Sequence, residues 1–106
     1  MKKETEIRAI IIEPGKEPRE ETIPNTLEAF QEIVGGYIEA VGLYGEDRII
    51  INEEGKLNGL PYNVIATEIF QNATHSTDYI VGTVIIAATR GENFASLDRV
   101  TAKLYL

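Results

Sequence analysis

Apolar residues occur in short runs along the chain, and the spacing within each run predicts an element of structure. Residues 6–13 (EIRAIIIE) are rich in β-branched side chains and end at the turn sequence PGKEP. They predict a first strand, with residues 19–23 as its partner across the turn. Because Ile10, Ile11 and Ile12 are consecutive, we expect both faces of this strand to be buried.

The segment PNTLEAFQEIVGG, residues 24–36, has the spacing of an amphipathic helix. Its apolar residues fall on one stripe: Leu27, Phe30, Ile33 and Val34. Asn25 is expected to cap the first turn, and Glu28, three residues later, completes a capping box. The pair Gly35–Gly36 predicts a left-handed end to this helix.

The middle of the chain predicts a hairpin followed by a helix. Two β-rich runs, residues 37–44 and 48–52, flank a Gly-Glu-Asp turn and indicate an antiparallel pair. The next apolar run, residues 64–70, fits a strand or a helix, and we favour a short helix that begins near Pro61. Residues 71–78 are predicted to form a loop.

The last part of the chain predicts one strand and one helix. The most apolar run, residues 79–88 (YIVGTVIIAA), predicts a central strand, and Ser96 is expected to cap a helix in the sequence LDRVTAKLYL. The order β-β-α-β-β-(α)-β-α indicates an α+β fold. We expect a single small domain over residues 1–106, mainly an antiparallel β-sheet with two or three helices packed on it.

The charge of the chain limits its partners. Ten Lys and Arg residues stand against 17 Asp and Glu residues, a net charge of −7. An acidic chain repels nucleic-acid backbones and anionic lipid surfaces, so we expect neither nucleic acid nor a membrane as partner. Residues 90–106 differ from the rest, with a net charge of +1 against −8 for residues 1–89. The C-terminal segment is therefore the place to look for an anion site.

Few residues suit catalysis or metal binding. The chain has no cysteine, which excludes disulfides and thiolate chemistry, and its only histidine, His75, precedes Ser76 and Asp78 in a predicted loop. Members of a catalytic triad usually come from separate elements, so we expect an exposed loop histidine and no enzyme. Glu53 and Glu54 offer oxygen ligands, but the spacing of a calcium loop is missing. We expect no metal site and no cofactor.

The start of the sequence has only a short apolar run before Pro14, and no stretch of the chain has the apolar length of a membrane span. We therefore expect a cytoplasmic protein.

Two segments combine the residue types that recognise nucleotides: aromatic faces, side-chain amides, and cations for phosphate. The candidates are Asn58, Tyr62, Asn63 and Thr67 in the first segment and Arg90, Asn93, Phe94, Arg99 and Lys103 in the second. Each also has a structural reading. Asn58 with Gly59 is a turn signal, Asn63 suits a helix cap, and Arg99 and Lys103 complement a helix dipole.

Several blocks of sequence resemble a family of small uncharacterised proteins encoded by Gram-positive bacteria, their phages and other mobile elements. The resemblance covers residues 7–97 and rests on IIEPGKEP, TLEAFQEIVGGYIEAV, INEEGKLNGLPYN, IVGT and ENFASL, of which VGGYIE and NEEGKLNGLPxN are the most specific. The family has no assigned activity. In size and in lacking catalytic residues, the chain is also similar to phage proteins that sequester signals of the Thoeris and CBASS defence systems.

This resemblance favours stoichiometric binding over catalysis. The leading hypothesis is a phage or mobile-element protein that sequesters a small nucleotide-derived immune signal, of the cyclic nucleotide or cyclic ADP-ribose type. Such a site is expected between the subunits of a homo-oligomer, because one domain of this size has little room for a deep pocket. The alternative hypothesis is an acidic protein-interaction module that inhibits a host DNA-binding or defence protein.

Overall fold

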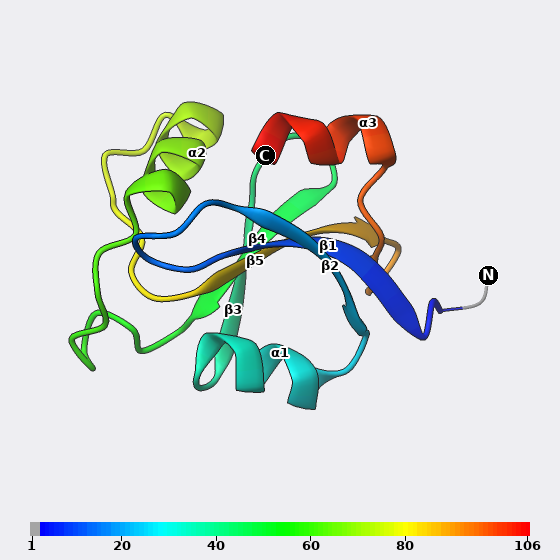
Figure 1. The fold of residues 1–106 in the computed structure, drawn as a ribbon, viewed down its shortest axis with the longest axis horizontal. Helices are drawn as coiled ribbons and strands as arrows, with labels where there is room; N and C mark the ends of the chain where they lie inside the picture. Colours follow the sequence, from blue (N-terminus) through cyan, green and yellow to red (C-terminus); the bar gives the residue numbers. More distant parts are fainter. Residues whose placement is uncertain (1–2) are drawn as a thin grey trace.

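A central antiparallel sheet organises the chain in the computed structural model, which describes residues 3–106 (Figure 1). The strands lie in the order β2-β1-β5-β4-β3, and β6 pairs with the last residues of β5. In chain order the elements are β1 (Glu6–Ile12), β2 (Arg19–Pro24), α1 (Leu27–Val34), β3 (Ile38–Gly42), β4 (Asp47–Asn52), α2 (Val64–Thr74), β5 (Val84–Arg90), β6 (Asn93–Ala95), α3 (Arg99–Ala102) and the 3-10 turn η1 (Lys103–Tyr105). The predicted α+β fold is confirmed.

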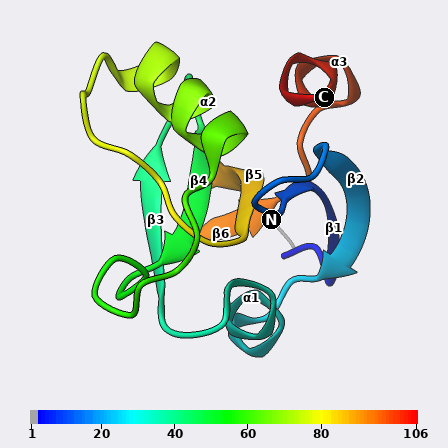
Figure 2. The same ribbon diagram turned by 60° about the vertical axis from the view of Figure 1, so that its left-hand side comes forward.

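Helices cover both faces of this sheet. Figure 2 shows α1 on one side of the strands and α2 and α3 on the other. On the α1 side, Ile11 and Phe30 belong to one buried cluster, whereas Ile10 and Phe70 belong to a second cluster on the opposite side. Neighbouring isoleucines enter different clusters because successive side chains of a strand point to opposite faces. The prediction that both faces of β1 are buried is confirmed.

The first helix begins one residue later than predicted. Thr26 is its N-cap, and the hydroxyl oxygen of Thr26 accepts a hydrogen bond from the N–H of Ala29 at 3.1 Å. The predicted cap at Asn25 is wrong, because the Asn25 amide is buried and donates to the carbonyl oxygens of Glu4 and Phe94. The predicted end is confirmed, with Gly35 in the left-handed conformation at φ 84°.

The helix predicted over residues 64–70 is confirmed but continues to Thr74. The Thr74 hydroxyl donates to the carbonyl oxygen of Phe70 at 2.7 Å, and His75 ends the helix at φ 60°. The prediction of a loop over all of residues 71–78 is therefore wrong for its first half. The apolar spacing of α2 weakens in this last turn, which explains why sequence reasoning ended the helix too early.

The central strand is shorter than predicted. β5 begins at Val84, so the strand assignment is wrong for residues 79–83. Gly82 has a φ of 76°, and its N–H donates to the carbonyl oxygen of Pro61 at 2.7 Å. This segment is held by the chain before α2 and not by a neighbouring strand.

The C-terminal region contains one strand that the sequence did not predict and a helix with a different cap. β6 is only three residues long and follows a turn at Gly91, so its hydrophobic pattern is too short to recognise. The predicted cap at Ser96 is wrong, because Asp98 caps α3. The Ser96 hydroxyl instead accepts from the Arg8 N–H and donates to the Glu4 carboxylate. No helix within residues 3–106 is long and apolar enough to cross a membrane.

Candidate functional site

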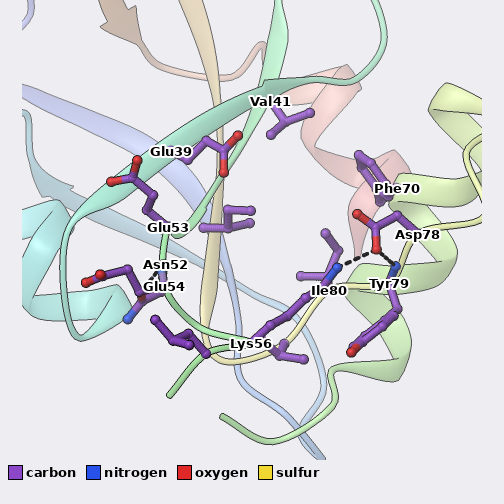
Figure 3. A pocket seen from close by; sticks show the side chains of 13 residues that line it. Glu39, Val41, Asn52, Glu53, Glu54, Lys56, Phe70, Asp78, Tyr79 and Ile80 are labelled. Carbon is purple, nitrogen blue, oxygen red and sulfur yellow. Dashed lines mark hydrogen bonds and ion pairs between the residues drawn. The ribbon is translucent and has the colours of Figure 1, made fainter. Parts of the chain in front are cut away.

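A pocket of about 530 Å³ opens at the β3 side of the sheet. Its walls come from β3, the end of β4, the segment after β4, helix α2 and the segment before β5. Figure 3 shows Glu39, Glu53 and Glu54 along one side and Asp78 and Tyr79 on the other. The apolar part of the lining consists of Val41, Ile51, Leu57, Phe70, Ile80 and Val81. The pocket therefore combines an apolar lining with an acidic rim.

The strand pairing of β3 with β4 sets which β3 side chains face this pocket. Glu39 pairs with Ile51, and Val41 pairs with Ile49. Ile49 lies in the buried cluster under α2, so these cross-strand pairs point to the α2 side of the sheet. On this face of the hairpin, Glu39 is therefore the one charged side chain beside the apolar Val41, Ile49 and Ile51. Its carboxylate remains exposed beside the pocket.

Asn52 connects the pocket to helix α1. Its side chain is buried, with Nδ2 donating to the carbonyl oxygen of Val34 at 3.2 Å and Oδ1 accepting from the N–H of Glu54 at 2.9 Å. A Cβ on Gly36 would lie 2.9 Å from Asn52 Nδ2, so this position must stay small. The sequence blocks VGGYIE and NEEGKLNGLPYN therefore meet in space, and this contact explains several of their residues structurally.

Two glycines allow close packing between the loop after β4 and the segment before β5. A Cβ on Gly55 would lie 2.9 Å from Val81 Cγ2, and one on Gly82 would lie 2.8 Å from Leu60 Cδ1. Leu60 N–H also donates to the Gly55 carbonyl oxygen at 3.0 Å. The loop after β4 packs tightly on the segment before β5. Much of its sequence is explained by this packing.

Two of the predicted ligand-binding residues are buried and bonded within the chain. Asn63 caps α2 through Oδ1, which accepts from the N–H of Ala66, and its Nδ2 donates to the carbonyl oxygens of Ile12 and Gly82. The Thr67 hydroxyl accepts from the Ile80 N–H at 2.9 Å and donates to the Ile80 carbonyl oxygen at 3.3 Å. Both side chains hold α2 in place and face away from solvent.

Tyr62 is half-exposed and pairs with an aromatic residue that sequence reasoning missed. Its ring stands edge-to-face to Tyr79, with centroids 5.8 Å apart. Lys56 Nζ lies 4.2 Å from the centroid of the Tyr79 ring and forms an ion pair with Asp78. The hydrogen bond from Lys56, together with that from the Tyr79 N–H, lowers the pKa of Asp78. Lys56 and Tyr62 lie in the block NEEGKLNGLPYN, whereas no quoted block contains Asp78 and Tyr79, which meet them only through the contact between two loops.

None of the predicted ligand-binding residues is among those that line this pocket. Asn58 is exposed in the turn after β4, whereas Arg90 and Asn93 are exposed at the β5–β6 turn. The Phe94 ring packs edge-to-face on Phe30, with centroids 5.2 Å apart. Arg99 and Lys103 are exposed on α3 and η1. Figures 1 and 2 place α3 away from the loop after β4.

His75, Ser76 and Asp78 do not form a triad. The Ser76 hydroxyl oxygen accepts from the backbone N–H of Asp78, and the Asp78 carboxylate bonds Lys56 and the Tyr79 N–H. The carboxylate is therefore not engaged with the histidine. Over residues 3–106, no group of three or more His, Cys, Asp or Glu side chains is arranged to hold a metal ion.

A second hollow, of about 350 Å³, lies near the C-terminus between Tyr44, Ile69, Asn72, Leu104 and Tyr105. Leu104 and Leu106 are 75% and 55% exposed, which leaves apolar surface at this end of the chain.

Comparison with known families identifies the family to which the chain belongs. A family model described as a domain of unknown function, DUF3846, matches residues 7–106. The chain belongs to the DUF3846 family. The predicted membership of a family without assigned activity is confirmed, and the match to DUF3846 extends past residue 97 through the C-terminal helix. No curated protein and no solved structure matches the sequence.

The electrostatics of the DUF3846 pocket separate the ligands that it favours from those that it disfavours. Its rim carries four carboxylates, from Glu39, Glu53, Glu54 and Asp78, against the single ammonium group of Lys56. Because Lys56 is paired with Asp78, three carboxylates lack a cationic partner within the pocket. An apolar lining below uncompensated carboxylates suits a ligand with an apolar stem and a positive end.

Proposed function

We propose that this DUF3846 protein is a non-catalytic binding protein whose pocket receives lysine or arginine side chains of a protein partner. One observation carries the proposal: three carboxylates without a cationic partner lie along one side of a pocket of about 530 Å³ whose lining is largely apolar. The methylene stem of a lysine or arginine fits the apolar lining, and its charged end reaches the rim. Hydrogen bonds between ions of opposite charge are among the stronger polar contacts in proteins.

This proposal develops the second of the two sequence hypotheses, the acidic interaction module. The family resemblance to proteins of Gram-positive bacteria, phages and mobile elements supports a host protein in the bacterial cytoplasm as the partner. A DNA-binding or defence protein fits best, because such proteins carry basic surfaces that bind nucleic acid. The charge of −7 on the whole chain would speed association with a basic surface.

Sequestration of a nucleotide-derived signal stays a prediction. The pocket is unfavourable for phosphate groups, since a phosphate charge about 4 Å from a carboxylate is repelled by about 1 kcal/mol in water and about 4 kcal/mol at the dielectric near a protein surface. The exposed Tyr62–Tyr79 pair is the feature that would favour a nucleotide, through base stacking. Cyclic ADP-ribose and a cyclic dinucleotide, titrated by calorimetry, distinguish the two functions.

The predicted homo-oligomer also stays a proposal. The exposed Leu104 and Leu106 beside the C-terminal hollow support it, because contiguous apolar surface favours association. Light scattering over a range of concentrations measures the state directly.

The test of the proposed function compares two variants of equal charge. The pocket variant carries Glu39→Gln, Glu53→Gln and Glu54→Gln, and the control variant carries Glu17→Gln, Glu20→Gln and Glu32→Gln at exposed positions outside the pocket. The probe is a blocked peptide of alternating lysine and threonine. We expect the pocket variant to bind this peptide about tenfold more weakly than the control, with the parent protein losing affinity as salt is added. If both variants lose the same amount of peptide affinity, the interaction depends on net charge alone, and the proposed binding pocket is contradicted.

A further inference from the structure

The pocket lies beside a free edge of the sheet. β3 is the last strand in the sheet order, and within residues 3–106 it pairs with β4 alone. In Figure 2, β3 (Ile38–Gly42) is the outermost strand on the left of the sheet, next to β4. An unpaired edge presents a row of backbone N–H and C=O groups that another extended segment can use.

The hydrogen bonds at the two ends of the hairpin show which backbone groups of β3 are free. The Tyr37 carbonyl oxygen accepts from the Glu53 N–H at 2.8 Å, and the Leu43 N–H donates to the Asp47 carbonyl oxygen at 2.9 Å. Residues 37 and 43 therefore face β4, and by the alternation of an antiparallel ladder so do Glu39 and Val41. The N–H and C=O groups of Ile38, Ala40 and Gly42 consequently point outward.

The opposite edge of the sheet is protected, whereas β3 is not. In β2, the outward-facing residues are Glu20, Thr22 and Pro24, because the Asn25 N–H donates inward to Thr5 at 2.9 Å. Pro24 removes one outward donor, and β2 carries several charged side chains. Proline and charge are the usual means by which proteins block pairing at an edge.

β3 contains no proline and fewer charged residues than β2. Its only charged residue is Glu39, and the outward positions Ala40 and Gly42 are small and exposed. The outward backbone groups of β3 therefore meet neither a proline nor a run of charged residues on their own strand. The two edges thus differ in the way expected if β3 receives a partner and β2 does not.

The pocket and the free edge are parts of one surface. Glu39 and Val41, on the α2 side of β3, line the pocket. In a segment paired with β3, every second side chain would point to the same side, about 7 Å from the next. A basic residue at alternate positions would therefore reach the carboxylates of Glu39, Glu53 and Glu54, while backbone hydrogen bonds fix its register.

We infer that a partner protein contributes an extended segment with lysine or arginine at alternate positions, and that this segment adds to the sheet as a strand beside β3. The inference rests on the proposed function, because it specifies how the basic partner binds the same pocket. Charge complementarity selects this occupant over a second copy of the chain. Two copies would bring together molecules of net charge −7, each with Glu39 on the edge.

The experiment blocks the edge without changing the pocket charge. Ala40→Pro removes one outward N–H of β3, and Thr22→Pro makes the matched change on β2. Circular dichroism and thermal melts confirm that each variant is folded. By calorimetry with the alternating lysine–threonine peptide, we expect Ala40→Pro to weaken binding about tenfold and Thr22→Pro to change it less than about twofold.

A modified peptide tests strand addition on the parent protein, so the test remains possible even if the Ala40→Pro variant misfolds. Methylating every second backbone nitrogen of the peptide, in each of the two registers, removes its donors while keeping every charge. We expect one of the two registers to bind about tenfold more weakly than the unmodified peptide. Equal binding of all three peptides would overturn strand addition.

The outcomes separate the inference from the proposed function. If Ala40→Pro binds like the parent while the pocket variant loses binding, strand addition is wrong and the pocket function stands. If the parent does not bind the unmodified peptide, both the inference and the proposed function are wrong. If light scattering shows a dimer that Ala40→Pro converts to a monomer, a second copy occupies the edge and the inference is overturned.

Discussion

Replacing Asn63 by alanine removes three hydrogen bonds from the buried junction between β1, α2 and the segment before β5. The lost contacts are the cap to the Ala66 N–H and two donations, to the carbonyl oxygens of Ile12 at 3.1 Å and Gly82 at 2.8 Å. The Asn63 side chain is only 1% exposed, so water does not replace them without local opening. The substitution therefore affects both the start of a helix and its anchor to the sheet.

The expected cost follows from these three contacts. Loss of an N-cap costs about 1 kcal/mol. Each buried carbonyl left without its donor adds about 1 kcal/mol or more. We expect Asn63→Ala to lower the free energy of unfolding by about 3 kcal/mol in total. That is a large fraction of the roughly 5–15 kcal/mol typical of a domain.

Equilibrium unfolding in urea, followed by circular dichroism, measures this loss. The matched control is Asn58→Ala, an exposed asparagine in the turn that precedes Pro61, for which we expect a change within about 0.5 kcal/mol. A loss of less than about 1 kcal/mol in Asn63→Ala would contradict this expectation. That result would free the Asn63 amide for the ligand-binding role that the sequence first suggested.

Three further predictions follow from other contacts. Gly36→Ala should destabilise the fold by about 1–3 kcal/mol in urea unfolding, because the new Cβ would lie 2.9 Å from Asn52 Nδ2. The control is Gly42→Ala, whose Cβ would meet nothing within 4 Å and which should be neutral or slightly stabilising in the same assay. Tyr105→Phe should cost about 1–3 kcal/mol in urea unfolding, because it removes the 2.6 Å hydrogen bond to the buried Asp47 carboxylate; an unchanged midpoint would contradict this. The Ser96 backbone N–H, with the Ser96 hydroxyl, lowers the pKa of Glu4. The stabilisation from Glu4 is therefore present above its unfolded-state pKa and is lost as pH falls through its folded-state pKa. Thermal melts of Glu4→Gln and the parent should differ at neutral pH and converge as the pH falls below the lowered pKa of Glu4.

Much of the fold could be predicted because its signals are local. The three consecutive isoleucines of β1 and the Gly35 end of α1 depend on patterns that a single segment contains. Elements that depend on distant contacts could not be predicted. Asn25 looks like a helix cap in sequence, but the Glu4 and Phe94 carbonyl groups bind its amide, so Thr26 caps the helix instead.

The candidate site was harder to predict for the same reason. Asn63 and Thr67 attract attention as polar residues, but the sequence does not show that both are buried and satisfied within the chain. Glu39, Asp78 and Tyr79 lie in three separate parts of the sequence and carry no motif. Alternation along β3 was the one available signal, since it places Glu39 on the same face as Val41.

An NMR titration of nitrogen-15-labelled protein with the alternating lysine–threonine peptide shows where a basic segment binds. If the pocket receives a basic segment, the largest amide shifts will occur in β3 and at Glu53, Asp78 and Tyr79, and the amide signals of residues 99–103 will not move. Shifts scattered over exposed acidic residues, or centred on residues 99–103, would contradict the proposed binding site.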